Sequence, residues 1–480
     1  MNLQPNSWNL WKISLSVSAL LSAFCITNAA FFPNLYPKLK LDARSKKDAG
    51  DPLLLTPYLK QGAISLAQNL SRVSITDTIG FRSHAGYFTI DEKYNSNLYF
   101  WYFPPFSKKE EAPVVLWLQG GPGGSSLFGL FTELGPLLAK KEGFALRKYH
   151  WALNYHLIFI DNPVGTGFSF TENEKAYCTN EDCVARGLYG AMKQFFQMFP
   201  HLKGNDFYIT GESYAGKYIP SLAMVIHQEN AKSSEKIHLK GMAIGNGYCD
   251  PKNQLDYGHY LYQLGLIDDN QLKIFLKYQD EIANQIDQKD WVQADILMDR
   301  LMDGELTNFS YFKYFTGYEY YYNYLQTSAT DDMIVFTELL QKDNVRRSVH
   351  VGGRPFDDGQ HVQLLLASDM LQTVAPKIEK LLSHYRIMFY NGQLDIVVAY
   401  PLTVNFLHKL KFSASEEYKN ARREVWKVGD DVAGYVKKAG NLTEVLIRNS
   451  GHMVPQDQPK WALNMITRFI DNTFDFPVIF

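Results

Sequence analysis

Short runs of apolar residues, each bounded by turn-forming residues, recur along the chain. They span residues 86–90, 97–103, 114–118, 157–160, 207–209, 241–244, 386–390 and 444–447. Stretches with helical patterning lie between most of them. Buried apolar strands that alternate with helices are typical of a sheet with helices on both faces. The pattern therefore predicts an α/β fold with a largely parallel central sheet.

The alternation of apolar runs and helical stretches is interrupted between residues 250 and 375, where charged helical patterning and tyrosine predominate. Seven tyrosines fall between Tyr311 and Tyr324. We interpret them as packing residues, because buried tyrosines usually pack and hydrogen-bond locally. We expect residues 250–375 to form an inserted, mostly helical cap. Residues 71–249 and 376–480 would then be the first and second parts of one core.

The N-terminus carries an apolar run, residues 13–26, which follows Lys12 and ends in small residues. Its length is typical of a signal peptide and short for a membrane span. We predict a signal peptide over residues 1–30, with an uncleaved anchor as the alternative. Residues 31–70 are expected to be an extended N-terminal segment. The mature chain should be secreted or lysosomal, without stable membrane insertion.

Sequons and cysteines fit an exported chain. N-x-S/T triplets at Asn69, Asn308 and Asn441 are candidate glycosylation sites. Cys25 lies in the predicted signal peptide, so the mature chain keeps three cysteines, and one intrachain disulfide at most can form. The three are Cys178, Cys183 and Cys249. Which two of them pair stays open.

Composition narrows the function. Of 480 residues, 46% are hydrophobic and 20% charged, which excludes a largely disordered chain. Lys and Arg number 48 against 50 Asp and Glu, so no basic field for nucleic acid exists. The HExxH motif is absent and the spacing of Cys178 and Cys183 is not typical of zinc sites. We predict no metal and no cofactor.

The segment 207–216, FYITGESYAG, carries the strongest chemical signal. A buried strand runs into a turn that holds Ser213, and a helical pattern follows. This is the context of a nucleophile elbow, although Ala215 stands where the second glycine of G-x-S-x-G would be. A serine hydroxyl needs a histidine base held by a carboxylate. Asp395 and His452 each follow a predicted strand, in the chain order that an α/β-hydrolase fold requires.

A second strand, 114–118, ends in the glycine run 120–124. Backbone N–H groups in such a turn can face a developing oxyanion, with the N–H of Tyr214 as a further donor. A phosphate cradle is the competing interpretation. It is disfavoured because GxxxxGK[ST] and GxGxxG are both absent and Pro122 lacks an N–H.

Five motifs carry a family resemblance. WLQGGPGGSS, FIDNPVGTGFSF, ITGESYAGKYIP, YNGQLD and GHMVPQDQP occur in the order found in the serine carboxypeptidases. The chain resembles this family over about residues 55–469, and most of all its vitellogenic-carboxypeptidase-like branch. The resemblance implies an α/β-hydrolase fold and release of single C-terminal residues from peptides at acid pH.

The resemblance also implies roles for individual residues. Ser213 would be the nucleophile, His452 the general base and then acid, and Asp395 the residue that orients the imidazole. Gly121 and Tyr214 would supply the oxyanion hole. The substrate carboxylate would be held by Gln119, Gly120, Glu133 and Glu212. Phe128, Thr132 and Met453 would line the pocket for the leaving residue.

Two carboxyl groups in one site repel each other when ionised, so one of them stays protonated and can donate to a third carboxylate. An ordinary ion pair at Glu133 or Glu212 is the alternative. The chain has Gln119 where the family commonly has Asn, and Gly124 where it commonly has Cys. It also lacks the cysteines for several family disulfides.

Two other functions remain at this point. An esterase or acyltransferase would keep the fold and the triad, but would not need the paired carboxyls. A non-catalytic binding or storage protein would keep the fold alone, since fold does not fix function.

Overall fold

The computed structural model describes residues 41–44, 46–140, 143–328 and 335–474. The signal peptide predicted for residues 1–30 lies outside them. Within these ranges, no helix combines the length and the apolar character that crossing a membrane requires.

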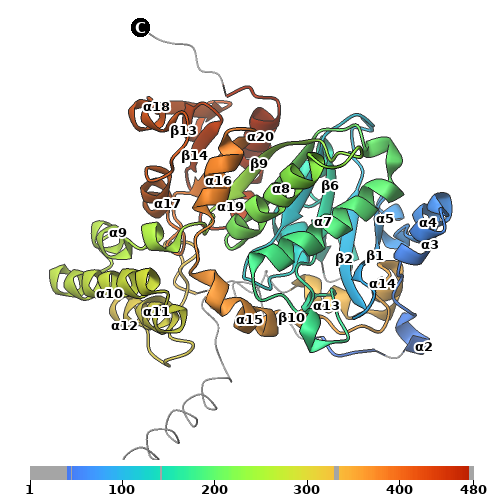
Figure 1. The fold of residues 1–480 in the computed structure, drawn as a ribbon, viewed down its shortest axis with the longest axis horizontal. Coiled ribbons are helices and arrows are strands. Elements are labelled where there is room, and N and C mark those ends of the chain that lie inside the picture. The colour runs from blue at the N-terminus through green and yellow to red at the C-terminus, as the bar shows by residue number, and fades with distance from the viewer. Residues whose placement is uncertain (1–40, 45, 141–142, 329–334, 475–480) are drawn as a thin grey trace, which may run out of the picture.

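One mixed sheet of ten strands organises the chain (Figure 1). In spatial order its strands are β1 (His84–Asp91), β2 (Ser96–Phe103), β6 (His156–Ile160), β3 (Val114–Leu118), β8 (Phe207–Glu212), β9 (Leu239–Gly245), β11 (Arg386–Gly392), β14 (Leu442–Ile447), β13 (Asp431–Ala439) and β12 (Glu424–Val428). From β6 to β14 all neighbours are parallel, and antiparallel strands extend both edges. The predicted parallel centre is therefore present, while β12 and β13 were not predicted.

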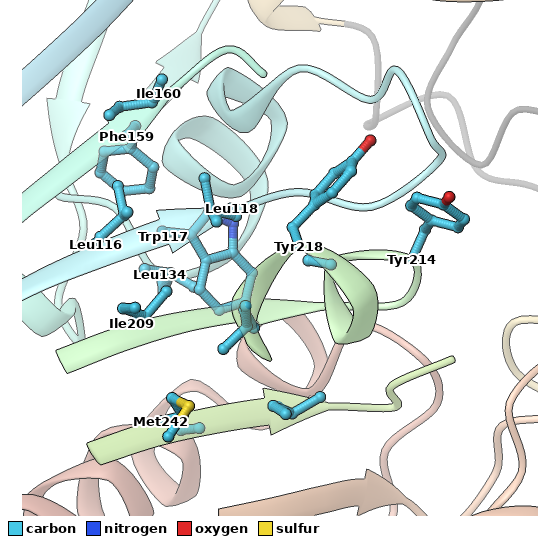
Figure 2. Packing of buried hydrophobic residues seen from close by; sticks show 14 of the residues in the cluster. Leu116, Trp117, Leu118, Leu134, Phe159, Ile160, Ile209, Tyr214, Tyr218 and Met242 are labelled. Atoms are coloured by element: carbon cyan, nitrogen blue, oxygen red, sulfur yellow. The ribbon is translucent and has the colours of Figure 1, made fainter. Parts of the chain in front are cut away.

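Helices cover the parallel strands because those strands are apolar on both faces. All residues of β3 and β8 are buried. α8 (Ala215–Asn230) packs on β8 and β9, with α7 (Glu181–Met198) and α16 (Ala375–Leu382) beside it. Figure 2 shows Trp117 of β3, Tyr218 of α8 and Met242 of β9 in this core, all fully buried.

The described part of residues 31–70, the predicted N-terminal extension, contains short helices joined by non-helical segments. It forms α2 (Lys46–Ala49), α3 (Thr56–Lys60) and α4 (Ile64–Leu70), and α5 (Ser74–Asp77) follows. Pro57 lies in the first turn of α3, where its fixed φ suits a helix. Leu55, Leu59 and Ala67 are buried, and α3 and α4 pack against α7.

The segment predicted as one cap divides into two parts (Figure 1). The first part forms a helical arm beside α17 (Tyr400–Leu407). The arm is made of α9 (Tyr257–Gln263), α10 (Asp269–Gln288), α11 (Trp291–Met298), the π-helix η6 (Asp299–Asp303) and α12 (Tyr311–Thr316). The second part comprises α13 (Val335–Leu340), α14 (Asp343–Ser348), β10 (Asp357–Asp358) and α15 (Gln360–Met370). It packs on the core, because β10 pairs with β7 (Thr166–Gly167) and α14 contacts α2 and α5.

The remaining elements are short or flank the second half of the sheet. They are α6 (Ser126–Phe128), the π-helix η1 (Gly129–Glu133), β4 (Leu137–Lys140), β5 (Gly143–Leu146), η2 (Trp151–Leu153), η3 (Glu174–Ala176), η4 (Pro200–Leu202), η5 (Pro251–Gln254), α17 (Tyr400–Leu407), α18 (Ser415–Asn420), α19 (Val454–Asp457) and α20 (Pro459–Ile470).

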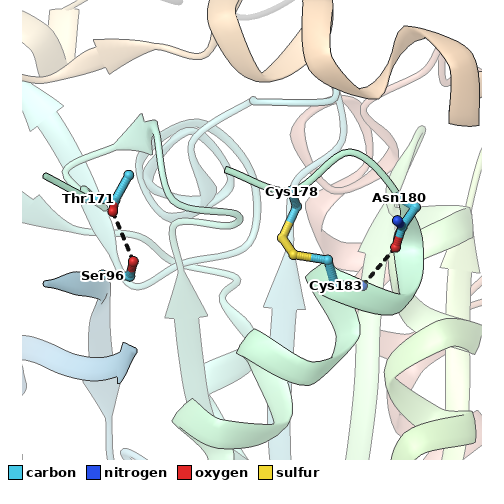
Figure 3. The surroundings of a disulfide bond; sticks show 5 residues. All are labelled: Ser96, Thr171, Cys178, Asn180 and Cys183. Atoms are coloured by element: carbon cyan, nitrogen blue, oxygen red, sulfur yellow. Dashed lines mark hydrogen bonds between the residues drawn. A yellow bond between two sulfur atoms is a disulfide. The ribbon is translucent and has the colours of Figure 1, made fainter. Parts of the chain in front are cut away.

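Cys178 and Cys183 form a disulfide at the start of α7 (Figure 3). Cys249 is a buried free thiol. Within the loop that the disulfide closes, the Asn180 side chain accepts the N–H of Cys183 at 3.0 Å and caps α7. The pairing that the sequence left open is thereby fixed.

Candidate active site

Ser213 lies at a sharp turn between β8 and α8. Its φ is +63°, a left-handed conformation that non-glycine residues rarely adopt. Gly211 makes the turn possible, because a Cβ there would lie 2.2 Å from the Leu118 carbonyl oxygen and 2.9 Å from the Ala215 Cβ. The buried Ala215 side chain faces Gly211, which has no Cβ. A methyl group at 215 is therefore compatible with the predicted elbow.

Asp395 and His452 follow β11 and β14 and lie in contact. The His452 Nδ1 is 2.8 Å from the Asp395 Oδ2, and both side chains are fully buried. A carboxylate only accepts, so Nδ1 is the donor in this bond and Nε2 is the ring nitrogen that can act as a base. Nε2 is buried and makes no hydrogen bond to any described residue, Ser213 included. The hydrogen bond between a catalytic serine and its histidine is often long when no substrate is bound.

Three further donors fix the Asp395 carboxylate. The Asn246 Nδ2 donates to Oδ2 at 2.6 Å, and the N–H groups of Val397 and Val398 donate to Oδ1 and Oδ2 at 3.0 and 3.3 Å. Sequence reasoning missed Asn246. Its position directly after the apolar strand β9, at the edge where the parallel strands end, was the available signal.

The glycine run after β3 lies against the elbow. A Cβ on Gly120 would be 2.6 Å from the Ser213 Cβ and 2.7 Å from the backbone nitrogen of Tyr214. Gly121 has a φ of +117° and precedes a cis peptide bond to Pro122. The structure thus brings the backbone at 120, one of the predicted carboxylate donors, beside Tyr214, one of the two predicted oxyanion donors.

Gln119 bridges two buried carboxyl groups. Its Nε2 donates to the Glu133 Oε1 at 3.0 Å and to the Glu212 Oε1 at 2.7 Å. The Trp117 indole donates to the Gln119 Oε1 at 2.7 Å, which fixes the amide orientation in the hydrogen-bond network. Gly129 permits this arrangement, because a Cβ there would lie 2.2 Å from the Trp117 Nε1. Sequence reasoning missed Trp117 and Gly129.

Burial changes the chemistry of both carboxyls. Both side chains are fully buried, and burial raises the pKa of Glu133 and of Glu212. The negative charge of Glu133 raises the pKa of Glu212 further, well above its ordinary value. Asp457 adds a smaller contribution that raises the pKa of Glu133. Burial thus favours a pair that keeps a proton at acid pH, and neither carboxyl forms a salt bridge within the part of the chain that the structure describes.

The residues predicted for the leaving-residue pocket occupy two segments. Phe128 ends α6 and is buried, and the Thr132 hydroxyl in η1 donates to the Phe128 carbonyl at 2.7 Å. Met453 is buried and follows His452 directly. α19, which begins at the next residue, packs against η1. Residues 128–132 therefore adjoin Glu133, Met453 adjoins His452, and the two segments meet where α19 packs on η1.

The predicted glycosylation sites differ in exposure. Asn69 and Asn308 are exposed, whereas Asn441 is half-buried and its Nδ2 donates to the Leu382 carbonyl at 2.9 Å. Glycosylation at these positions stays a prediction.

A family model described as serine carboxypeptidase matches residues 74–472. The chain is 50% identical to venom serine carboxypeptidase of Apis mellifera over 454 residues, which cover 94% of this chain and 97% of that protein. It is 47% identical to vitellogenic carboxypeptidase of Aedes aegypti, covering 96% and 99% of the two chains. It is 44% identical to probable serine carboxypeptidase CPVL of Homo sapiens, covering 96% and 97%.

Among solved structures, the prohormone-processing carboxypeptidase Kex1(Δ)p from Saccharomyces cerevisiae superposes with a TM-score of 0.73, covering 84% of this chain and 96% of that one. At 22% identity this likeness concerns the fold. The molecule has an α/β-hydrolase fold, as the sequence predicted. The chain belongs to the serine carboxypeptidase family, and it is a serine-type carboxypeptidase.

Proposed function

We propose that the chain releases single C-terminal amino acids from peptides through a Ser213–His452–Asp395 triad and an acyl-enzyme. The Ser213 Oγ attacks the last peptide carbonyl while the His452 Nε2 takes its proton and then returns it to the leaving amine. Asp395 holds Nδ1 and stabilises the imidazolium. The N–H groups of Gly121 and Tyr214 bind the oxyanion. Water then hydrolyses the acyl-enzyme by the same steps in reverse.

One observation carries the preference for free C-termini, namely the Gln119 amide that joins two buried carboxyls directly beside the elbow. Glu212 immediately precedes Ser213 in the chain. A protonated carboxyl and the Gly120 N–H offer donors to a substrate carboxylate. The Gln119 amide, whose two N–H groups both bond the carboxyls, joins them when it exchanges one of these bonds for the substrate. An ester substrate has no such group for them to bind.

The same pair supports activity at acid pH. The pKa of each carboxyl is raised mainly by burial, so the site keeps its proton in mildly acidic solution. As the pH rises, the site loses the proton and its negative charge repels the substrate carboxylate. An acidic secretory or lysosomal compartment suits such a site, and peptide or protein C-termini are the substrates.

The test incubates the purified mature protein at pH 5 with an N-blocked dipeptide, its C-terminal amide and a matching ester. Release of the C-terminal amino acid by the native protein, but not by Ser213→Ala, supports the proposal. Ser65→Ala, which changes an exposed serine in α4, is the matched control. Equal cleavage of the acid and the amide would overturn the carboxylate site. Activity that survives in Ser213→Ala would overturn the triad.

A further inference from the structure

Residues 320–324, which we call the tyrosine strap, follow the helical arm and contact the loop that carries Asp395. The Tyr321 carbonyl accepts from the N–H groups of Ile396 and Val397 at 3.0 and 3.2 Å. The N–H of Tyr324 donates to the Leu394 carbonyl at 2.9 Å. The strap therefore bonds to this loop on both sides of Asp395.

The next carbonyl of the strap, that of Tyr322, bonds the loop that carries His452. The backbone N–H of His452 donates to the Tyr322 carbonyl at 2.7 Å, and the two rings lie 5.3 Å apart. Asn323 and the N–H of Gly451 both donate to Asp457, at 3.3 and 2.7 Å. The carbonyls of two successive residues therefore hold both loops of the active site. The Tyr321 carbonyl bonds the loop that carries Asp395, and the Tyr322 carbonyl bonds His452 itself.

The close approach is built into the sequence at Gly451. A Cβ at this position would lie 2.2 Å from the Tyr322 carbonyl oxygen and 2.8 Å from the Asn323 Cβ. Because Gly451 has no side chain, the tyrosine strap can pack directly against the backbone that precedes His452.

Side chains of the arm anchor the strap and the Asp395 loop. The Tyr321 hydroxyl donates to the Asp303 Oδ1 at 2.6 Å, and both side chains are buried. On α9, the hydroxyls of Tyr257 and Tyr260 donate to the carbonyls of Val397 and Asp395 at 2.8 and 3.0 Å. The tyrosine cluster thus packs, as the sequence indicated, but its hydroxyl and backbone bonds also reach the Asp395 and His452 loops.

We propose that the tyrosine strap is a positioning element of the active site, and that Tyr321, held by Asp303, sets the register between the Asp395 and His452 loops. The inference rests on the triad proposed above. It makes the helical arm a support of catalysis.

Tyr321→Phe removes the bond to Asp303 and keeps the ring. A typical buried hydrogen bond contributes about 1 kcal/mol, so we expect kcat to fall about 3- to 10-fold while KM stays within about 2-fold. The rate at which a phosphonofluoridate labels Ser213 should fall by the same factor, because this probe has no C-terminal carboxylate. Asp303→Asn keeps an acceptor for the Tyr321 hydroxyl and should retain most of kcat.

Tyr314→Phe is the matched control, since Tyr314 lies on α12 with 72% exposure. If Tyr321→Phe does not fold, Asn323→Ala cuts the link to Asp457 and should likewise lower kcat and the labelling rate. A lower Tm with unchanged kcat and labelling rate, or a change confined to KM, would overturn the proposal. Failure of the triad itself is distinguishable, because Ser213→Ala would then stay active.

Discussion

A methyl group on Gly120 would lie 2.6 Å from the Cβ atom of Ser213, far inside the contact distance of two carbon atoms. It would also lie 2.7 Å from the backbone nitrogen of Tyr214. The glycine run and the nucleophile elbow are therefore packed backbone against backbone. Neither can move without displacing donors that we assign to the oxyanion and to the substrate carboxylate.

Gly120→Ala should lower kcat/KM by about 100-fold or more, because loss of one oxyanion donor alone costs about that much. The measurement is steady-state hydrolysis of an N-blocked dipeptide, with Tm recorded in parallel. Gly204→Ala is the control, since a Cβ there meets nothing within 4 Å. Activity near the native level in Gly120→Ala would show that the two segments can separate without consequence.

The carboxyl pair predicts a rise of KM with pH. Burial and the charge of Glu133 raise the pKa of Glu212 well above its ordinary value, so the pair keeps a proton in acid solution and loses it as the pH rises. Substrate binding should weaken over this range while kcat changes less. Glu212→Gln cannot ionise and should reduce the rise, whereas Glu235→Gln, at a site with 80% side-chain exposure, should not. A native KM that stays flat from pH 5 to 8 would contradict the assignment.

Asp295 predicts a pH dependence of stability in the arm. Burial raises its pKa to about 7. Between the ordinary aspartate pKa of about 4 and this value the folded state binds more protons, so stability falls as pH rises, by at most about 4 kcal/mol. Asp295→Asn should flatten the decline of Tm between pH 5 and 8, whereas Asp280→Asn, at an exposed position in α10, should leave it unchanged. An equal decline in Asp295→Asn and the native protein would refute this.

The parallel centre of the sheet could be predicted because its strands, such as β3, are apolar on both faces. Strand ends then placed Asp395 and His452 at one edge, where the structure finds them in contact. β13 escaped prediction because Lys437 and Lys438 interrupt its apolar pattern and the strand is only partly buried. The N-terminal helices are only four to seven residues long, too short for a periodic signal.

Contacts that depend on distant parts of the chain could not be predicted from local pattern. Asn246 and Asp395 are 149 positions apart, and their bond exists only because β9 and β11 are neighbours. The Tyr322 carbonyl likewise reaches His452 across 130 positions of sequence. The sequence indicated that the tyrosines pack in the interior. Which loops they hydrogen-bond depends on the path of the backbone, which the local pattern does not give.

Asn246 supplies the shortest hydrogen bond to the Asp395 carboxylate, at 2.6 Å. Asn246→Ala should therefore lower kcat by about 10- to 100-fold with little change in KM, since a hydrogen bond to a charged group contributes roughly 1.5–3 kcal/mol. Asn253→Ala is the matched control, because Asn253 also donates to a carboxylate at 2.6 Å, that of Asp250. Its loss should reduce Tm without the same fall in kcat. Stopped-flow acylation would separate the effect on chemistry from product release. Equal effects of the two variants on kcat would mean that Asn246 contributes to stability alone, and that the two backbone donors suffice to hold Asp395 against His452.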